Sequence, residues 1–229
     1  MANLYGIGVG PGDSELLTLK GARLIRECDV IALPKSGKKT NVAFEIAKEA
    51  IPEIVDKEIV EIDMPMTRDK VKLKEAHKKG ADILGSILDS GRDIAFLTLG
   101  DPTVYSTYCY VHNLIIEGGH QAQIIPGVPS FCAVSAALNE GLTEAKECLH
   151  IIPASYDGLE EALELKGTKV LMKSGTKLGK VKDLISEKCS KETVRMVEKC
   201  GMDGEKIYNS LDEIDEEASY FSVLVVKNR

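Results

Sequence analysis

A glycine-rich segment near the N-terminus has the composition of a ligand-binding loop. Residues 6–13 read Gly-Ile-Gly-Val-Gly-Pro-Gly-Asp and continue an apolar run typical of a buried strand. Because glycine has no side chain, a ligand or a neighbouring backbone can approach such a loop closely. The dinucleotide pattern GxGxxG does not fit, since Pro11 or Asp13 would occupy its third glycine position. A tight strand-to-helix turn without any ligand is the alternative interpretation.

A second motif follows an apolar strand in the middle of the chain. Residues 98–105 read Thr-Leu-Gly-Asp-Pro-Thr-Val-Tyr, at the carboxyl end of a strand predicted at 94–99. Open parallel sheets bind ligands outside the carboxyl ends of their strands, so this loop and the glycine-rich loop can face one crevice. Asp101 fits the N-cap of a helix over 103–117, with Pro102 at its first position. A carboxylate there can also help to hold a cationic ligand.

A third motif, Pro-Gly-Val-Pro-Ser-Phe at residues 126–131, follows a short strand predicted at 123–125. It precedes a helix of small residues predicted over 132–138. Ser130 can cap that helix or donate a hydrogen bond to a ligand, and the sequence does not choose between the two roles.

Alternating strands and helices must position these loops. The pattern predicts strands over residues 4–9, 30–33, 58–62 and 94–99, and helices near 16–25, 41–50, 67–90 and 103–117. This alternation is typical of an α/β fold with a mostly parallel N-terminal sheet. Later strands at 149–152, 170–172, 194–198 and 220–226, helices near 159–165 and 176–188, and a hairpin over 206–211 favour a mixed C-terminal sheet. We therefore predict two domains, at residues 1–119 and 120–229.

Composition narrows the class of protein. The 229 residues carry a net charge of −7, which disfavours a nucleic-acid partner. No apolar run reaches the roughly 18 residues of a membrane span and no basic leader is visible, so we expect a cytoplasmic protein. The six cysteines form no CxxC pair and the four histidines lack metal-ligand spacing, so we expect neither a disulfide framework nor a protein-bound metal.

The order of the three motifs resembles the tetrapyrrole methylase family. GxGxGPGD at residues 6–13, GDPxVY at 100–105 and PGVPS at 126–130 carry this resemblance, which covers most of the chain. Residues 4–20, 33–36 and 97–107 are similar to the C-20 methyltransferases of cobalamin biosynthesis, which act on cobalt-factor II or precorrin-2. The resemblance implies a homodimer of two-domain subunits that binds S-adenosylmethionine in the cleft between the domains and methylates a small tetrapyrrole.

The resemblance also implies a set of site residues. Transferred motif by motif, the cofactor contacts are Pro11, Leu99, Gly100, Asp101, Val104, Tyr105, Ser130, Phe131, Met172 and Cys200. A meso carbon of the macrocycle would attack the activated methyl group in line, with positioning as the main source of catalysis. Asp101, a tyrosine such as Tyr105, or water would accept the C-20 proton, and the sequence leaves this choice open.

The carboxylates of such a substrate call for cations. Lys35, Lys38 and Lys39, in a glycine-containing loop after a strand, are the predicted contacts. A second group of lysines on the helix over 67–90 is more typical of a solvated face, because acidic residues alternate with them: Lys70, Lys72, Lys74, Lys78 and Lys79. Tyr105, Tyr108 and Tyr110 can line the macrocycle site, although at least one of them is expected in the core.

Three other functions compete with this interpretation. The nearest is another branch of the family, with a different acceptor carbon or the protein side chain that diphthine synthase modifies. A noncatalytic tetrapyrrole-binding protein would keep the fold without turnover. An NAD-type enzyme is disfavoured by the broken fingerprint and by Leu33-Pro34 where the second strand should end in a ribose-binding acid.

Overall fold

The computed structural model describes residues 1–35, 41–67, 69–155 and 157–227. The chain divides into two compact units, residues 1–129 and 130–229. Among the described helices, none combines the length and the apolar character needed to cross a bilayer.

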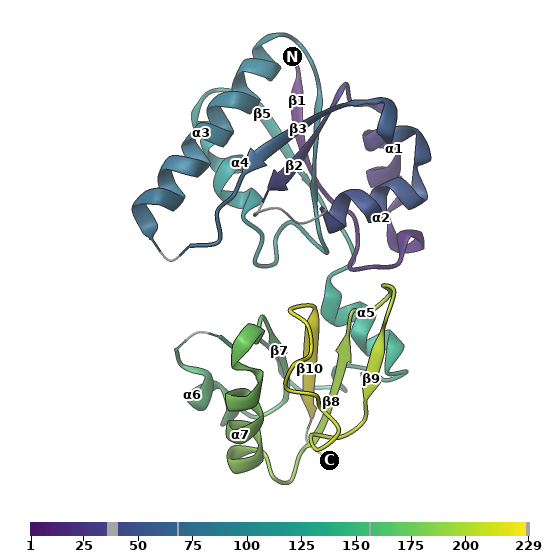
Figure 1. The fold of residues 1–229 in the computed structure, drawn as a ribbon, viewed down its shortest axis with the longest axis vertical. Helices are drawn as coiled ribbons and strands as arrows, with labels where there is room; N and C mark the ends of the chain where they lie inside the picture. Colours follow the sequence, from purple (N-terminus) through teal and green to yellow (C-terminus); the bar gives the residue numbers. More distant parts are fainter. Residues whose placement is uncertain (36–40, 68, 156, 228–229) are drawn as a thin grey trace. The chain divides into compact units, whose positions relative to one another are not determined.

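The first unit is built on a five-stranded sheet in the order β3-β2-β4-β1-β5 (Figure 1). All four pairings of neighbouring strands are parallel, as predicted. The strands are β1 (Asn3–Gly8), β2 (Val30–Lys35), β3 (Glu58–Asp63), β4 (Ile94–Thr98) and β5 (Gln121–Ile125). Every residue of β4 is buried, which explains the uninterrupted apolar sequence of this central strand.

The boundary between the two units lies later in the chain than predicted, because β5 belongs to the first sheet. The sequence suggested that a second domain begins at residue 120, but β5 pairs in parallel with β1 over residues 121–125. It therefore completes the first sheet, and the first unit extends to residue 129. The pairing joins segments more than a hundred residues apart, so local sequence pattern carries no sign of it.

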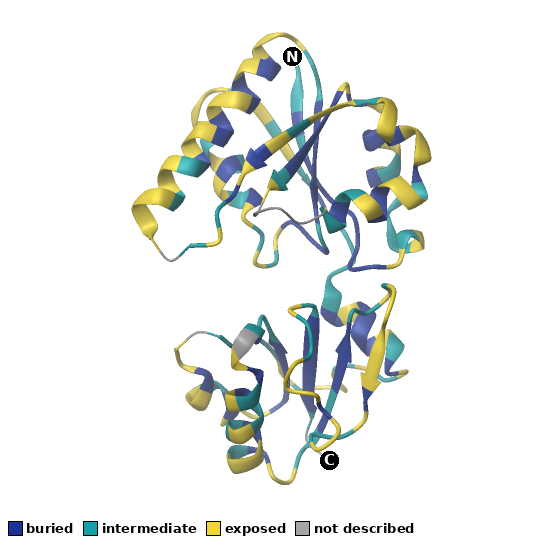
Figure 2. Ribbon diagram, viewed as in Figure 1, coloured by how far each residue is buried: buried dark blue, intermediate teal, exposed yellow. Residues whose placement is uncertain are grey.

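Helices cover both faces of this sheet. Helices α1 (Leu19–Glu27) and α2 (Val42–Ala50) pack on one face in a core that includes Ile25 and Ile46. Helices α3 (Lys70–Asp89) and α4 (Tyr108–Glu117) pack side by side on the other, where Leu84 and Ile115 join a second core. Two short 3-10 turns, Ser14–Leu16 and Pro52–Asp56, link these elements. Figure 2 shows the dark buried strands between the half-exposed helices.

The second unit has a mixed sheet, as predicted, whose five strands follow the order β6-β7-β10-β8-β9. Its strands are β6 (Leu149–Pro153), β7 (Thr168–Met172), β8 (Thr193–Glu198), β9 (Lys206–Tyr208) and β10 (Ser222–Lys227). Only β6 and β7 pair in parallel, and β10 runs antiparallel to both of its neighbours. Helices α6 (Leu159–Leu163) and α7 (Leu178–Lys188) cover one apolar core, the 3-10 turn Gly175–Lys177 precedes α7, and α5 (Ser130–Ala137) contacts β8 and β10.

Candidate active site

Three motif loops meet at the carboxyl edge of the first sheet. They follow β4, β1 and β5, which are adjacent in the sheet, so their loops are adjacent as well. Backbone hydrogen bonds join the first two: the Gly100 N–H donates to the Gly10 carbonyl over 2.8 Å, and the Val9 N–H donates to the Thr98 carbonyl over 3.0 Å. The structure therefore brings the glycine-rich loop and the loop after β4 together, as the sequence predicted.

The glycines in these loops make room for neighbouring backbone. A Cβ on Gly8 would lie 2.5 Å from the Gly100 carbonyl oxygen and 2.7 Å from the Gly127 nitrogen. A Cβ on Gly127 would lie 2.3 Å from that same oxygen. At Gly8 and Gly127, therefore, the missing side chain makes room for neighbouring backbone. Gly10 and Gly100 have φ of 85° and 71°, a region that favours glycine.

The Asp101 carboxylate links two of the loops. Its side chain is only 8% exposed. One oxygen accepts the Gly127 N–H over 3.0 Å, and the other accepts the Thr103 N–H over 2.8 Å and the Thr103 hydroxyl. The expected helix N-cap role is wrong, because α4 begins at Tyr108 and not at Thr103. The carboxylate instead closes a turn and fixes the loop after β5, since it can accept several hydrogen bonds at once.

The tyrosines of this region have different roles. Tyr105 has φ of 51°, an uncommon conformation for a residue with a side chain, and it is 42% exposed. Partial burial raises the pKa of its hydroxyl. Tyr108 is fully buried against Gly6, and its hydroxyl lies 3.0 Å from His112 Nδ1. Tyr108 is therefore a core residue, in line with the expectation that at least one tyrosine would be.

The other transferred contacts fall in both units. In the first unit Pro11 is buried, and Leu99 and Val104 are half-buried in or beside the joined loops. In the second unit Ser130 is the first residue of α5 and Phe131, the next, is buried. These positions are compatible with the predicted cofactor contacts, which stay predictions.

Met172 and Cys200 lie at one edge of the second sheet. Strands β7 and β8 flank β10 and both run antiparallel to it, so their carboxyl ends meet at the same edge. Met172 is the last residue of β7, and Cys200 lies two residues beyond β8. Lys173 and Lys199, beside them, have φ of 56° and 53°. Such backbone conformations are uncommon and often occur at ligand sites.

Glu198 is a buried carboxylate at this edge that sequence reasoning missed. It is 8% exposed and accepts the Ser219 N–H over 2.8 Å and the Tyr208 hydroxyl over 3.1 Å. Burial by itself would raise its pKa, but the hydrogen bonds from Ser219 and Tyr208 and the charge of Lys206 outweigh it and hold the pKa below its ordinary value. Its partners are distant in the chain, so the only signal in the sequence was an acid at the end of an apolar strand.

The predicted substrate lysines are only partly accounted for. Lys35 ends β2, is exposed, and pairs with Glu61 on β3. This hydrogen bond and charge raise the pKa of its ammonium group. Lys38 and Lys39 lie outside the described residues. Lys35 thus already has a carboxylate partner, and a substrate carboxylate would have to compete with it.

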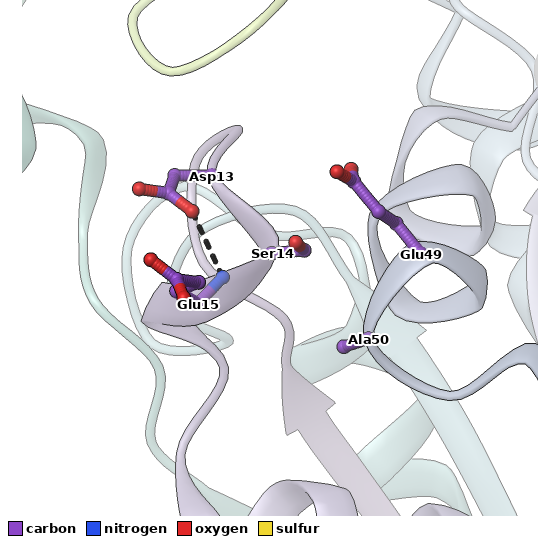
Figure 3. Close-up of a pocket in the computed structure, with 5 residues that line it drawn as sticks. All are labelled: Asp13, Ser14, Glu15, Glu49 and Ala50. Carbon is purple, nitrogen blue, oxygen red and sulfur yellow. Dashed lines mark hydrogen bonds between the residues drawn. The ribbon is translucent and has the colours of Figure 1, made fainter.

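An open cavity of about 610 Å³ lies beside the end of the glycine-rich loop (Figure 3). It is lined by Asp13, Ser14, Glu15, Glu49 and Ala50. The Asp13 carboxylate accepts the Glu15 N–H over 2.9 Å, which caps the 3-10 turn that starts at Ser14. Three carboxylates in one lining repel an anionic ligand, so we do not assign this cavity to a polycarboxylate. The described residues contain no group of three or more His, Cys, Asp or Glu arranged to hold a metal ion.

Proteins of known family and known structure are similar to this chain over most of its length. The sequence model of the tetrapyrrole (corrin/porphyrin) methylases matches residues 3–215. A probable cobalt-precorrin-2 C(20)-methyltransferase of Methanocaldococcus jannaschii is 36% identical over 98% of this chain and 95% of its own length. A precorrin-2 C(20)-methyltransferase of Sinorhizobium is 26% identical over 99% and 95%. The fold matches uroporphyrin-III C-methyl transferase of Thermus thermophilus, solved with S-adenyl homocysteine, with a TM-score of 0.75, 20% identity, and coverage of 99% and 97%.

Proposed function

The chain belongs to the tetrapyrrole methylase family and is a tetrapyrrole methyltransferase, and on this premise we propose that it methylates C-20 of cobalt-factor II in corrin biosynthesis. The methyl donor in this proposal is S-adenosylmethionine. The observation that carries it is the 36% identity with a probable cobalt-precorrin-2 C(20)-methyltransferase across nearly the full length of both chains. Identity spread over both units supports a common acceptor better than similarity confined to the motif loops would.

The metal-free acceptor is the second candidate. The Sinorhizobium relative is named for precorrin-2 without cobalt, and it also aligns over nearly its whole length. The higher identity of the Methanocaldococcus relative favours the cobalt-containing acceptor.

The residues at the two sheet edges are suited to holding a methyl donor. In the first unit we assign this role to Pro11, Leu99, Gly100, Asp101, Val104 and Tyr105. In the second unit we assign it to Ser130, Phe131, Met172 and Cys200. The Glu198 carboxylate supports the second set, because it is buried and accepts the Ser219 N–H beside the Cys200 loop, which fixes the backbone there.

Positioning explains how this chain would accelerate the reaction. Bound S-adenosylmethionine supplies a methyl group already activated by its sulfonium, so the protein need not supply a nucleophile. Hydrogen bonds between the motif loops hold their backbone in one arrangement, and such preorganisation favours a near-attack geometry between methyl group and acceptor carbon. The Asp101 oxygens already accept hydrogen bonds from Gly127 and Thr103. We therefore favour water over Asp101 as acceptor of the C-20 proton, and the raised pKa of Tyr105 keeps its hydroxyl protonated at neutral pH.

Anaerobic turnover with a labelled methyl donor tests the proposal. The protein is incubated with S-[methyl-13C]adenosylmethionine and either cobalt-factor II or precorrin-2, and the product is located by mass spectrometry and NMR. We expect the label at C-20, with faster turnover of the cobalt-containing acceptor. Faster turnover of precorrin-2 would select the second candidate. Label at another carbon, or on neither acceptor, would overturn the assignment to C-20.

A further inference from the structure

Helix α3 carries lysines where its own electrostatics disfavour them. Lys70, Lys72 and Lys74 occupy its first turns, and no acidic residue lies in the first turn. The N-terminal end of a helix has a partial positive charge, so cations there destabilise the helix. The Asp69 side chain offsets part of this by capping the Val71 and Lys72 N–H groups. Residues that destabilise their own helix in this way are typical of functional surfaces.

The structure separates these lysines into two groups. Lys72 lies 3.9 Å from Asp69, and Lys78 lies 3.0 Å from Asp82, as on an ordinary solvated helix. Like Lys79 on the opposite face of the helix, Lys70 and Lys74 are exposed and make no ion pair with any residue that the structure describes. At 100° per residue, Lys70 and Lys74 lie on the face of α3 that carries His77, two turns and one turn before it.

An aromatic stack continues this face onto the neighbouring helix. The His77 ring on α3 and the Tyr110 ring on α4 are parallel within 6°, with centroids 4.9 Å apart. His77 is 8% exposed, whereas Tyr110 is 60% exposed. His77 Nε2 is buried and has no hydrogen-bond partner among the described residues. Burial lowers the pKa of His77, so the stack is uncharged at neutral pH. The exposed member of the stack is the flat Tyr110 ring.

This face lies at the same edge of the first unit as the motif loops. Helices α3 and α4 each connect one parallel strand to the next and return along the sheet, so both begin at the carboxyl edge (Figure 1). Only two residues, Ser106 and Thr107, separate the loop that ends at Tyr105 from the start of α4. Lys70, Lys74 and Tyr110 therefore combine cations with a flat apolar ring beside the loops assigned to the methyl donor.

We propose that Lys70, Lys74 and Tyr110 form a recognition surface for the acceptor macrocycle. The proposal rests on the proposed function, because that function makes the acceptor a flat ring system bearing several carboxylates. The two unpaired ammonium groups complement those carboxylates, and the tyrosine ring offers a face for stacking. The charge complementarity is local, since the whole chain carries a net charge of −7. Complementary charges at such a surface increase affinity for one partner and exclude others.

Charge reversal on two faces of one helix tests this surface. The variant Lys70→Glu with Lys74→Glu changes the proposed face, and the control Lys72→Glu with Lys79→Glu makes the same change in charge on the opposite face. We expect the first to raise the KM for the tetrapyrrole on the order of tenfold and the control to change it less than about twofold. The KM for S-adenosylmethionine should stay unchanged in both. Equal effects of the two double variants on the tetrapyrrole KM would overturn the proposal.

The tyrosine is tested by removing its hydroxyl and its ring separately. Tyr110→Phe keeps the stack and should leave the tetrapyrrole KM near that of the native protein, whereas Tyr110→Ala should raise it severalfold. S-adenosylhomocysteine affinity, measured by calorimetry, verifies that each variant is folded. If the native protein binds cobalt-factor II and precorrin-2 in an anaerobic absorbance titration but transfers a methyl group to neither, the proposed function fails. Unchanged binding in Tyr110→Ala and in the Lys70/Lys74 variant overturns this surface alone.

Discussion

Buried carboxylates at strand ends organise the loops of both units. Asp101 accepts the N–H of Gly127, and Glu198 accepts the N–H of Ser219. In each case one charged side chain fixes a backbone segment more than twenty residues away. Hydrogen bonds to an ionised acceptor are stronger than those between neutral groups. Each of these two acids therefore fixes the conformation of a neighbouring loop through one side chain.

Replacing Asp101 with Asn should destabilise the first unit. An amide has one acceptor oxygen, so either the Gly127 or the Thr103 N–H loses its partner, at a cost of about 1–3 kcal/mol. Urea unfolding followed by circular dichroism measures the loss, and calorimetry should show weaker S-adenosylhomocysteine binding. The exposed Asp82→Asn is the control, because Asp82 only pairs with Lys78 at the surface. Equal stability of the two variants would refute the proposed link between the loops.

Glu198 should give the second unit a specific dependence on pH. Its pKa is lowered in the folded protein from an ordinary value of 4.5. The ionised form therefore adds stability that is present above pH 4.5 and is lost as the pH falls through the lowered pKa. Glu198→Gln removes this contribution, so the stability difference between native and variant protein should be large at pH 7 and shrink below pH 4.5. Urea unfolding across this range checks it, and a difference that does not vary with pH would contradict it.

The helices and strands that depend on interactions between nearby residues were predicted correctly from the sequence pattern. The buried strands and amphipathic helices of both units follow from apolar spacing, and the three motif loops were located because strand ends and glycines are visible in sequence. The start of α4 was missed because Asp101 and Pro102 imitate a helix start, while Tyr105 adopts a left-handed conformation that interrupts it. The placement of β5 and the partners of Glu198 depend on contacts between distant segments, which no local pattern encodes.

The packing of the motif loops predicts a large effect of one methyl group. Gly8→Ala would place its Cβ 2.5 Å from the Gly100 carbonyl oxygen, and neither backbone can move without breaking the β1–β4 junction. We expect a loss of about 1–3 kcal/mol in the free energy of unfolding and weaker S-adenosylhomocysteine binding. Gly141→Ala is the matched control, because its nearest neighbour would be an oxygen 3.7 Å away. Thermal unfolding compares them, and equal midpoints would show that the loops are loosely packed.

For the whole molecule, membership of the tetrapyrrole methylase family predicts S-adenosylmethionine as the cofactor. The glycine-rich loop also lacks the dinucleotide fingerprint of NAD-binding folds. S-adenosylhomocysteine at a hundred times its Kd should stabilise the protein by about 2.7 kcal/mol, whereas NAD should not. A thermal-shift assay with each ligand reads this out. Stabilisation by NAD alone would contradict the assignment.

Hydrogen exchange with and without S-adenosylhomocysteine shows whether the strand-end loops hold the methyl donor. Exchange of backbone amides, followed by mass spectrometry, reports each segment separately. We predict slower exchange on ligand addition in residues 8–13 and 99–105 of the first unit and in residues 172–173 and 199–204 of the second. The helix segment 83–89, remote from the carboxyl edge, should exchange at its original rate. Tight binding with slower exchange only outside these loops would show that other segments hold the methyl donor.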